Sequence, residues 1–238
     1  MGDVGKFVAS QAWAKSPELA VNVAALSWAP KEGGGLGFDK GYPDVTYEGG
    51  RAELEAAFEG KHVEAIDAAA EDAVDRLRTV VEGCDAVVAC LGNREPFMPR
   101  WVARGTETAV DACRAAKVPR LVVLNSFGIA DESVLRQNET IPRIWRVLLA
   151  TLLRRARTDL RQQATFLADS CDDLDVLVVK PAGLSPEKAP TRTWKVATPD
   201  DNAIDYAVAK SDVATFMLDE ALHPTMHATA VTIGGAIA

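Results

Sequence analysis

Two glycines close to the N-terminus precede a segment with a helical pattern. Gly2 and Gly5 enclose Asp3 and Val4 in a G-x-x-G spacing, and Gly5–Lys15 is predicted to be a helix. The free N–H groups and the dipole at a helix N-terminus bind phosphate, and glycine lets the backbone come close to it. The same spacing is common at ordinary helix starts. Phosphate binding and a plain helix start therefore both stay open for Gly2, Val4 and Gly5.

The residue types do not support two widespread kinds of catalytic centre. A tyrosine general acid assisted by lysine needs a Tyr-x-x-x-Lys pair, and only Tyr206 with Lys210 has that spacing. That pair follows the last long apolar run, which is the wrong place for such a dyad. The histidines His62, His223 and His227 lack suitably spaced Cys or His partners, so the sequence indicates no metal site.

The composition favours a globular domain in a reducing compartment. Of the 238 residues, 48% are hydrophobic, which is enough for one ample core. The formal net charge of −8 argues against nucleic acid as a partner, because such proteins need clustered Lys and Arg. No apolar run approaches the roughly 20 residues that span a bilayer. The cysteines form no C-x-x-C pair and are expected to be reduced thiols, so we expect a cytoplasmic location, with organellar targeting left open.

Short apolar runs alternate with longer helical patterns along the chain, which is typical of βα units around a parallel sheet. The predicted strands are Val21–Trp28, His62–Ile66, Asp85–Leu91, Arg120–Ser126, Asp175–Lys180 and Ala230–Ile233. The third, fourth and fifth runs contain Val and Leu without polar alternation, as expected of strands that are buried on both faces. We therefore expect these three strands at the centre of the sheet.

Helical patterns separate these strands and cover Asp72–Glu82, Val102–Lys117 and Trp145–Ser170. This order predicts one α/β domain over residues 1–238, a Rossmann-type doubly wound parallel sheet. Such a domain begins with a strand and a Gly-rich turn, whereas here a helix precedes the first predicted strand. We expect the first strand and the start of the Gly-rich turn to be missing, which would leave two strand edges unmatched and weaken dinucleotide binding.

Two stretches are predicted to lie outside these βα units. Residues 31–61 are predicted to be a loop insertion, because Gly33–Gly37 (GGGLG) is followed by turn-forming residues. No helix follows those glycines, which argues against a phosphate-binding turn there. Residues 181–229 come after the fifth strand and are predicted to supply loops and a helix on the substrate side.

The ends of two predicted strands are candidates for dinucleotide contact, because open α/β sheets bind ligands at the carboxyl ends of their strands. Leu91, Gly92 and Asn93 end the third run, and Gly92 would let the backbone approach a ribose or adenine; a simple turn glycine is the alternative. Ser27 and Trp28 end the first run, where an acid selects NAD and a basic residue accommodates NADP. The missing acid weakly favours NADP, with simple packing as the alternative role for Trp28.

Several segments occur together in one order along the chain. Gly2, Gly5, Lys6 and Val8 are followed by EGCDAVVACLG (Glu82–Gly92), RGTETAVDACRAAKVPRLVVLNSFGI (Arg104–Ile129), RTDLRQQ (Arg157–Gln163), LDVLVVKPAGL (Leu174–Leu184), KSDVATFMLDEAL and AVTIGG. This set resembles the atypical short-chain dehydrogenase/reductases with an NAD(P)H-binding domain, the group that contains flavin reductase/biliverdin reductase B-like and NmrA-like proteins. The resemblance covers nearly the whole chain from Gly2.

The resemblance implies roles for residues at three strand ends. Asp67 and Ala68 would contact adenine, and the alternative for Asp67 is a solvated loop carboxylate. Ser126 would lie near the nicotinamide as the candidate catalytic residue, with Phe127 beside it. The alternative for Ser126 is a hydroxyl that caps the last carbonyl of its strand. Pro181 would pack against the nicotinamide.

The resemblance also implies an NAD(P)H-dependent oxidoreductase that transfers hydride to a flavin-, tetrapyrrole- or quinone-like acceptor, with NADP weakly preferred. In such reactions the cofactor and the substrate carry the chemistry. Lys180 stands where the family has an Arg before the Pro, so a planar guanidinium contact is lost. This departure and the missing Tyr-x-x-x-Lys pair also suit a non-catalytic dinucleotide-binding sensor or assembly factor of the NmrA-like type.

Overall fold

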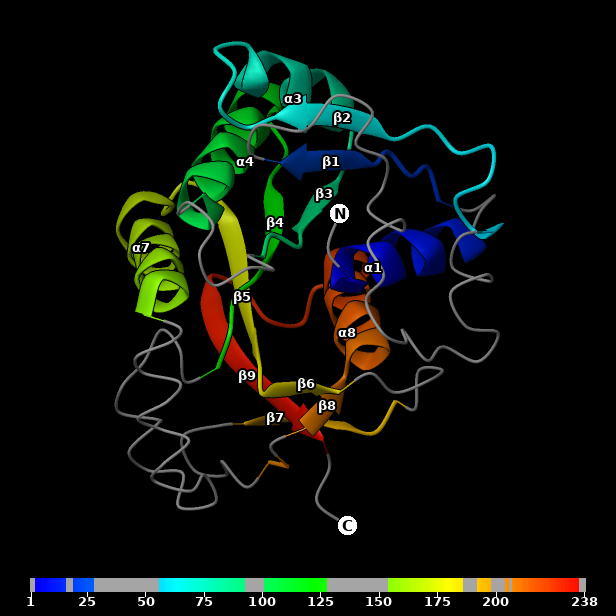
Figure 1. The fold of residues 1–238 in the computed structure, drawn as a ribbon, viewed down its shortest axis with the longest axis vertical. Helices are drawn as coiled ribbons and strands as arrows, with labels where there is room; N and C mark the ends of the chain where they lie inside the picture. Colours follow the sequence, from blue (N-terminus) through cyan, green and yellow to red (C-terminus); the bar gives the residue numbers. More distant parts are fainter. Residues whose placement is uncertain are drawn as a thin grey trace.

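A computed structural model describes residues 3–15, 19–27, 56–92, 101–127, 154–185, 192–197, 204–205 and 207–235 of the chain (Figure 1). The helices are α1 (Asp3–Ala14), α3 (Ala73–Val81), α4 (Val102–Ala116), α7 (Arg154–Ser170) and α8 (Lys210–Leu222). The strands are β1 (Ala24–Ser27), β2 (Glu64–Asp67), β3 (Ala86–Ala89), β4 (Arg120–Leu124), β5 (Asp175–Pro181), β6 (Gly183–Ser185), β7 (Trp194–Ala197), β8 (Ala207–Ala209) and β9 (Thr229–Gly235). Within this part of the chain, no helix is long and apolar enough to cross a membrane.

The central sheet is mostly parallel and has the strand order β3-β4-β5-β9-β7. Every neighbouring pair in it is parallel except β7 and β9, which run antiparallel at the edge. The central strands β4 and β5 have buried apolar side chains on both faces, which explains why their sequences lack polar alternation. β1 and β2 form a separate parallel pair, and β6 pairs with β8.

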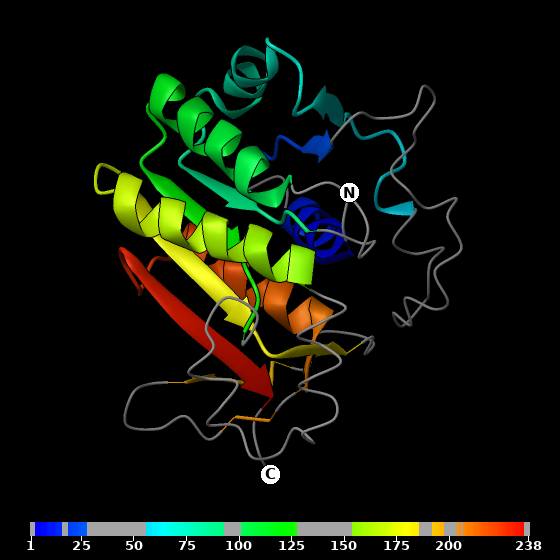
Figure 2. The same cartoon turned by 60° about the vertical axis from the view of Figure 1, so that its left-hand side comes forward.

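Helices cover both faces of the sheet. Figure 2 shows α4 and α7 in front of the five-stranded sheet, with α1 and α8 behind it. One apolar cluster joins α3, α4 and α7 to side chains such as Leu121 and Val123 of β4. The other cluster joins α1 and α8 to the opposite face of the same strand, through Val122 and Leu124. The fold is therefore a three-layer α/β domain of the doubly wound type.

The two parallel sheets meet without a shared strand in the part of the chain that the structure describes. There β1 bonds to β2 alone and β3 bonds to β4 alone, yet Leu26 and Ile66 of one sheet and Val123 of the other share one apolar cluster. In the described residues the two sheets are therefore joined by side-chain packing and not by hydrogen bonds between their strands.

The predicted elements are confirmed where the structure describes them, with small shifts of their ends. The six predicted strands correspond to β1, β2, β3, β4, β5 and β9, and the predicted N-terminal helix begins at Asp3 rather than Gly5. Residues 145–153 of the predicted long helix and residues 31–55 of the predicted loop lie outside the described residues. The region 181–229 contains α8 as expected, and also the short strands β6, β7 and β8.

Candidate functional site

Ser126 and Phe127 lie at the carboxyl end of the central sheet, held against the end of β5. The N–H of Asn125 donates to the carbonyl of Val179 at 2.8 Å, and the N–H of Phe127 donates to the carbonyl of Pro181 at 3.0 Å. The pairing of β4 with β5 therefore continues past Leu124. This brings three predicted site residues, Ser126, Phe127 and Pro181, to one place on the edge.

Ser126 belongs to the face of the sheet that α1 and α8 cover. Leu124 packs into the cluster with these helices, whereas the side chain of Asn125 turns to α7 on the other face. Because side chains alternate along an extended chain, Ser126 follows Leu124 to the α1 face. Its side chain is half-buried, so its hydroxyl is near the surface at the edge where α/β sheets bind ligands.

Leu91 and Gly92 follow β3 at the same edge. A Cβ on Gly105 of α4 would lie 3.0 Å from Cδ1 of Leu91 and 3.3 Å from Cδ2 of Leu26, so both leucines pack on α4 at that point. Gly92 is exposed, and a Cβ built on it would have no atom of the described chain within 4 Å. None of the described residues therefore lies over the Cα of Gly92 on its Cβ side.

Asp67 is the last residue of β2, and Ala68 follows it in a tight turn. The Oδ1 atom of Asp67 accepts the N–H of Ala69 at 2.9 Å, and Ala68 is buried. Asp67 pairs in register with Ser27, so the ends of β1 and β2 coincide. The Asp67 carboxylate thus organises its own turn at the edge of the sheet.

At the start of α1 the side chains mainly support the fold. Val4 and Phe7 are buried in the cluster with α8, and Lys6 is only 3% exposed. Gly5 is half-buried in the first turn. Any dinucleotide contact by Val4 or Gly5 would therefore come from the backbone. The predicted site residues Gly2, Trp28 and Asn93 lie outside the described residues.

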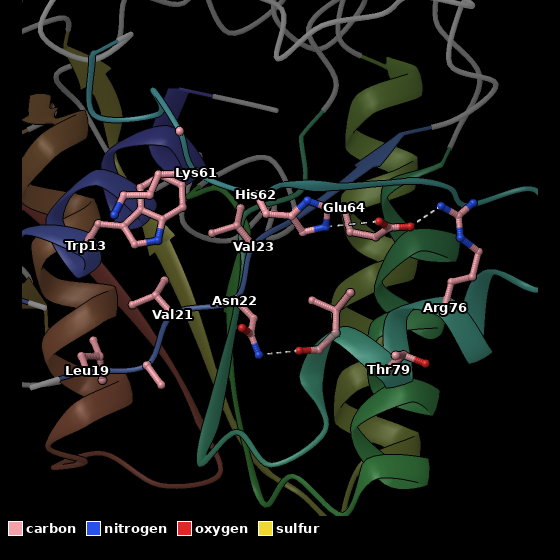
Figure 3. A pocket seen from close by; sticks show the side chains of 13 residues that line it. Trp13, Leu19, Val21, Asn22, Val23, Lys61, His62, Glu64, Arg76 and Thr79 are labelled. Atoms are coloured by element: carbon pink, nitrogen blue, oxygen red, sulfur yellow. Dashed lines mark hydrogen bonds and ion pairs between the residues drawn. The ribbon is translucent and has the colours of Figure 1, made fainter. Parts of the chain in front are cut away.

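A cavity of about 720 Å³ opens at the other end of β1 and β2, as Figure 3 shows. It is lined by residues before and at the start of these strands, by residues of α3 and by Trp13, which lies edge-on to Phe58 at 4.8 Å between ring centroids. Arg76 forms an ion pair with Glu64 at its rim and lowers the pKa of that carboxyl. Because it lies at the amino ends of the strands, this cavity is separate from the predicted site.

Three of the described thiols have raised pKa values, and the described side chains form no metal centre. Burial raises the pKa of the Cys90 and Cys113 thiols to about 12 and also raises that of Cys171, so these thiols stay protonated at neutral pH. Within the described ranges no group of three or more His, Cys, Asp or Glu side chains could hold a metal ion. At the carboxyl edge, the Ser126 hydroxyl can donate a hydrogen bond to a substrate.

Three polar residues behind this edge were missed by the sequence interpretation: Asn125, Asp159 and Gln163. All three are buried. Asp159 accepts the backbone N–H of Trp101 at the start of α4, and Gln163 of α7 bonds to Asn125 and to Thr106 of α4. The sequence contains a signal for two of them. Asp159 and Gln163 share the i, i+4 spacing of Leu167, which places two polar side chains on the buried stripe of α7.

A sequence profile described as NAD(P)H-binding matches residues 50–224, nearly three quarters of the chain. The chain belongs to this NAD(P)H-binding family. The match to the family includes β2 through α8 and with them Asp67, Gly92, Ser126 and Pro181; α1 and β1 precede it. No curated protein matches the chain at a significant level.

Solved structures share the fold of this family member across almost the whole chain. A short-chain dehydrogenase/reductase from Veillonella parvula in complex with NADP is 13% identical, with a TM-score of 0.59, and 98% of this chain and 90% of that chain are covered. The oxidoreductase ylbE from Lactococcus lactis is 14% identical, with a TM-score of 0.61 and coverages of 99% and 87%. ChuY from E. coli CFT073 is 16% identical, with a TM-score of 0.63 and coverages of 98% and 92%. These likenesses establish a Rossmann-type NAD(P)-binding fold.

Proposed function

We propose that the protein is an NAD(P)H-dependent oxidoreductase that passes a hydride to a flavin-, tetrapyrrole- or quinone-like acceptor. The observation that carries this proposal is the meeting of Ser126 and Phe127 with Pro181, through the Phe127 N–H and Pro181 carbonyl at 3.0 Å. The place lies at the carboxyl edge of the sheet in a member of an NAD(P)H-binding family.

The described residues fit a dinucleotide along this edge. The backbone of Gly92 suits close contact with a ribose or an adenine, because it has no side chain and a Cβ there would meet no described atom within 4 Å. The first turn of α1 lies on the same face as Ser126, and its N–H groups suit the pyrophosphate. The adenine contact of Asp67 and Ala68 would use backbone atoms beside the turn that the carboxylate closes.

Bound NAD(P)H supplies the hydride, and the chain supplies position and hydrogen bonds. In this proposal Ser126 is the catalytic residue: its hydroxyl donates a hydrogen bond to the acceptor atom that gains negative charge. Such a role requires no strong acid. Pro181, buried at the end of β5, would form the apolar floor beneath the nicotinamide.

We also propose that NADPH is preferred over NADH. Ser27 ends β1 where an NAD-selective enzyme has an acid that binds the ribose hydroxyls. The NADP found in the Veillonella parvula structure is consistent with this preference. A comparison of kcat/KM for NADPH and NADH with one acceptor tests it, and equal values would contradict it.

The acceptor test is NADPH oxidation with FMN, biliverdin and menadione in turn. The proposal predicts oxidation with at least one of them. A second candidate function is a non-catalytic dinucleotide-binding sensor, which Lys180 favours because it replaces the Arg of the related reductases. Saturable NADPH binding without oxidation of NADPH by any of the three acceptors would support the sensor and contradict the reductase.

A further inference from the structure

A buried chain of hydrogen bonds runs from α4 through α7 to the end of β4. The Thr106 hydroxyl on α4 donates to the Val102 carbonyl at 2.8 Å and accepts from Nε2 of Gln163 at 2.8 Å. Oε1 of Gln163 accepts from Nδ2 of Asn125 at 2.6 Å. Gln163 and Thr106 are fully buried, and Asn125 is 5% exposed. Buried polar side chains of this kind remain ordered because each lost partner is costly.

The chain of bonds ends on the backbone of Ser126. Oδ1 of Asn125 accepts the Ser126 N–H at 2.7 Å, between the two ladder bonds that Asn125 and Phe127 make to β5. The acceptor of the Ser126 N–H is therefore a side chain. The last pair between β3 and β4 is Ala89 with Val123, so β3 ends before it reaches Ser126. Asn125 decides how the peptide before Ser126 is oriented.

The orientation of the Asn125 amide is itself determined by its partners. Its Nδ2 donates both to Gln163 and to the carbonyl of Leu160 at 3.1 Å, so its oxygen must face the Ser126 N–H. A flipped amide would set its NH₂ group against the Ser126 N–H and its oxygen against two acceptors. These partners therefore fix the orientation in which the Asn125 amide accepts the Ser126 N–H.

We propose that Asn125, Gln163 and Thr106 are positioning residues that hold Ser126 in place for the hydride-transfer step. This inference rests on the proposed function, which gives Ser126 its contact with the acceptor. The three residues lie on the α7 side of the sheet and Ser126 faces the α1 side, so they act through the backbone and do not touch the substrate. A displacement of a reacting group by even a fraction of an ångström lowers the rate of a positioned reaction.

Matched pairs of variants separate positioning from a general effect on stability. Gln163→Met removes the link to Asn125, and Gln162→Met makes the same change at the exposed neighbour on α7. Thr106→Val removes the acceptor of Gln163, whereas Thr108→Val removes a hydroxyl of α4 that bonds to the carbonyl of Arg104 at 3.1 Å. Gln163→Glu keeps an acceptor for Asn125 and serves as the conservative rescue.

The experiment combines NADPH oxidation with FMN and amide hydrogen exchange at Ser126. Gln163→Met is expected to lower kcat about tenfold while KM for NADPH stays within about twofold, with faster exchange at Ser126. Thr106→Val should lower kcat and speed exchange at Ser126 to a smaller extent, and Gln163→Glu should recover part of kcat. The two control variants should behave as wild type. A Gln163→Met protein whose Ser126 exchange and kcat match those of Gln162→Met would overturn the inference.

The failure of the proposed function gives a different result. If wild-type protein does not oxidise NADPH, or if Ser126→Ala leaves kcat unchanged, the function assigned to Ser126 is wrong and the positioning role falls with it. If Ser126→Ala lowers kcat but Gln163→Met does not, the function stands and the positioning role is overturned alone. A fall in kcat that is matched by a rise in KM and a loss of stability would mark Gln163 as purely structural.

Discussion

Asp159 of α7 caps the start of α4 through Val102. Oδ2 of Asp159 accepts the N–H of Val102 at 3.0 Å, and the same carboxylate accepts the N–H groups of Trp101 and Ala103 at 3.0 Å. The carboxylate is buried and lies at the positive end of the helix dipole. One side chain thus satisfies three donors that α4 cannot satisfy itself.

Replacing Asp159 should therefore lower stability strongly. Asp159→Ala leaves three buried N–H groups without their acceptor and is expected to cost about 3 kcal/mol of unfolding free energy. Urea denaturation measures the change, and Asp169→Ala on the exposed side of α7 is the matched control. If Asp159→Ala unfolds at the same urea concentration as Asp169→Ala, the cap contributes nothing.

Loss of the Arg120 side chain should be tolerated better when one of its carboxylate partners is removed as well. Its guanidinium is 4% exposed and contacts Asp175 at 2.7 Å and Glu220 at 3.3 Å, the latter being buried as well. Arg120→Met removes the cation that contacts the buried Glu220 side chain and should cost about 3–5 kcal/mol. The double variant Arg120→Met/Glu220→Gln removes that carboxyl as well and should regain part of that loss in the same denaturation assay. Equal stability of the single and double variants would contradict this account.

Asp175 should contribute to stability in a pH-dependent way. Burial raises the pKa of its carboxyl, but hydrogen bonds from His227, from the Ala228 N–H and from Arg120 outweigh burial and lower it overall. A lowered pKa in the folded state means that the contribution is complete above the unfolded value of about 3.9 and is lost as the pH falls through the folded value.

The unfolding free energy measured between about pH 6 and pH 3 tests this expectation. Wild type should lose more stability than Asp175→Asn over that interval, because the variant has no carboxyl to protonate at this position. Asp169→Asn, an exposed change on α7, should follow the wild-type curve. Parallel curves for wild type and Asp175→Asn would show that the ion pairs of Asp175 do not stabilise the fold.

Two glycines should respond in opposite ways to alanine. A Cβ on Gly234 would lie 2.4 Å from the Asp205 carbonyl oxygen, so Gly234→Ala should cost about 1–3 kcal/mol through a forced backbone shift. Gly92→Ala meets no described atom within 4 Å and should change stability by less than about 0.5 kcal/mol. NADPH binding by Gly92→Ala should nevertheless weaken by about tenfold, because the added methyl occupies the proposed ligand contact. Unchanged NADPH affinity would remove Gly92 from the site.

The sequence pattern predicts the central strands because burial on two faces leaves a mark in composition. The runs that became β4 and β5 are continuous in Val and Leu, and they end within two residues of the predicted bounds. β6 and β8 are three residues each and form by pairing Gly183–Ser185 with Ala207–Ala209. Such short strands depend on a tertiary contact and have no periodic pattern of their own.

The arrangement of the candidate site was predictable in part, because the ends of buried strands can be recognised in the sequence. Ser126, Phe127 and Pro181 come at strand ends, and parallel strands bring their carboxyl ends together. Asn125 and Gln163 are 38 residues apart, and Gln163 and Thr106 are 57 apart. Their contact depends on how α4 and α7 pack on the sheet, and that packing is not a local property of the sequence.

Single-turnover oxidation of NADPH by FMN in wild type and Ser126→Ala tests most directly whether hydride transfer occurs at the carboxyl edge beside Ser126. Ser10→Ala is the control, since the Ser10 hydroxyl bonds to the Phe7 carbonyl of α1 at 3.1 Å, within its own helix. The predicted result is a rate for Ser126→Ala about tenfold below that of wild type and of Ser10→Ala, with NADPH affinity unchanged. Equal rates for Ser126→Ala and wild type would contradict the assignment of the reaction to this edge.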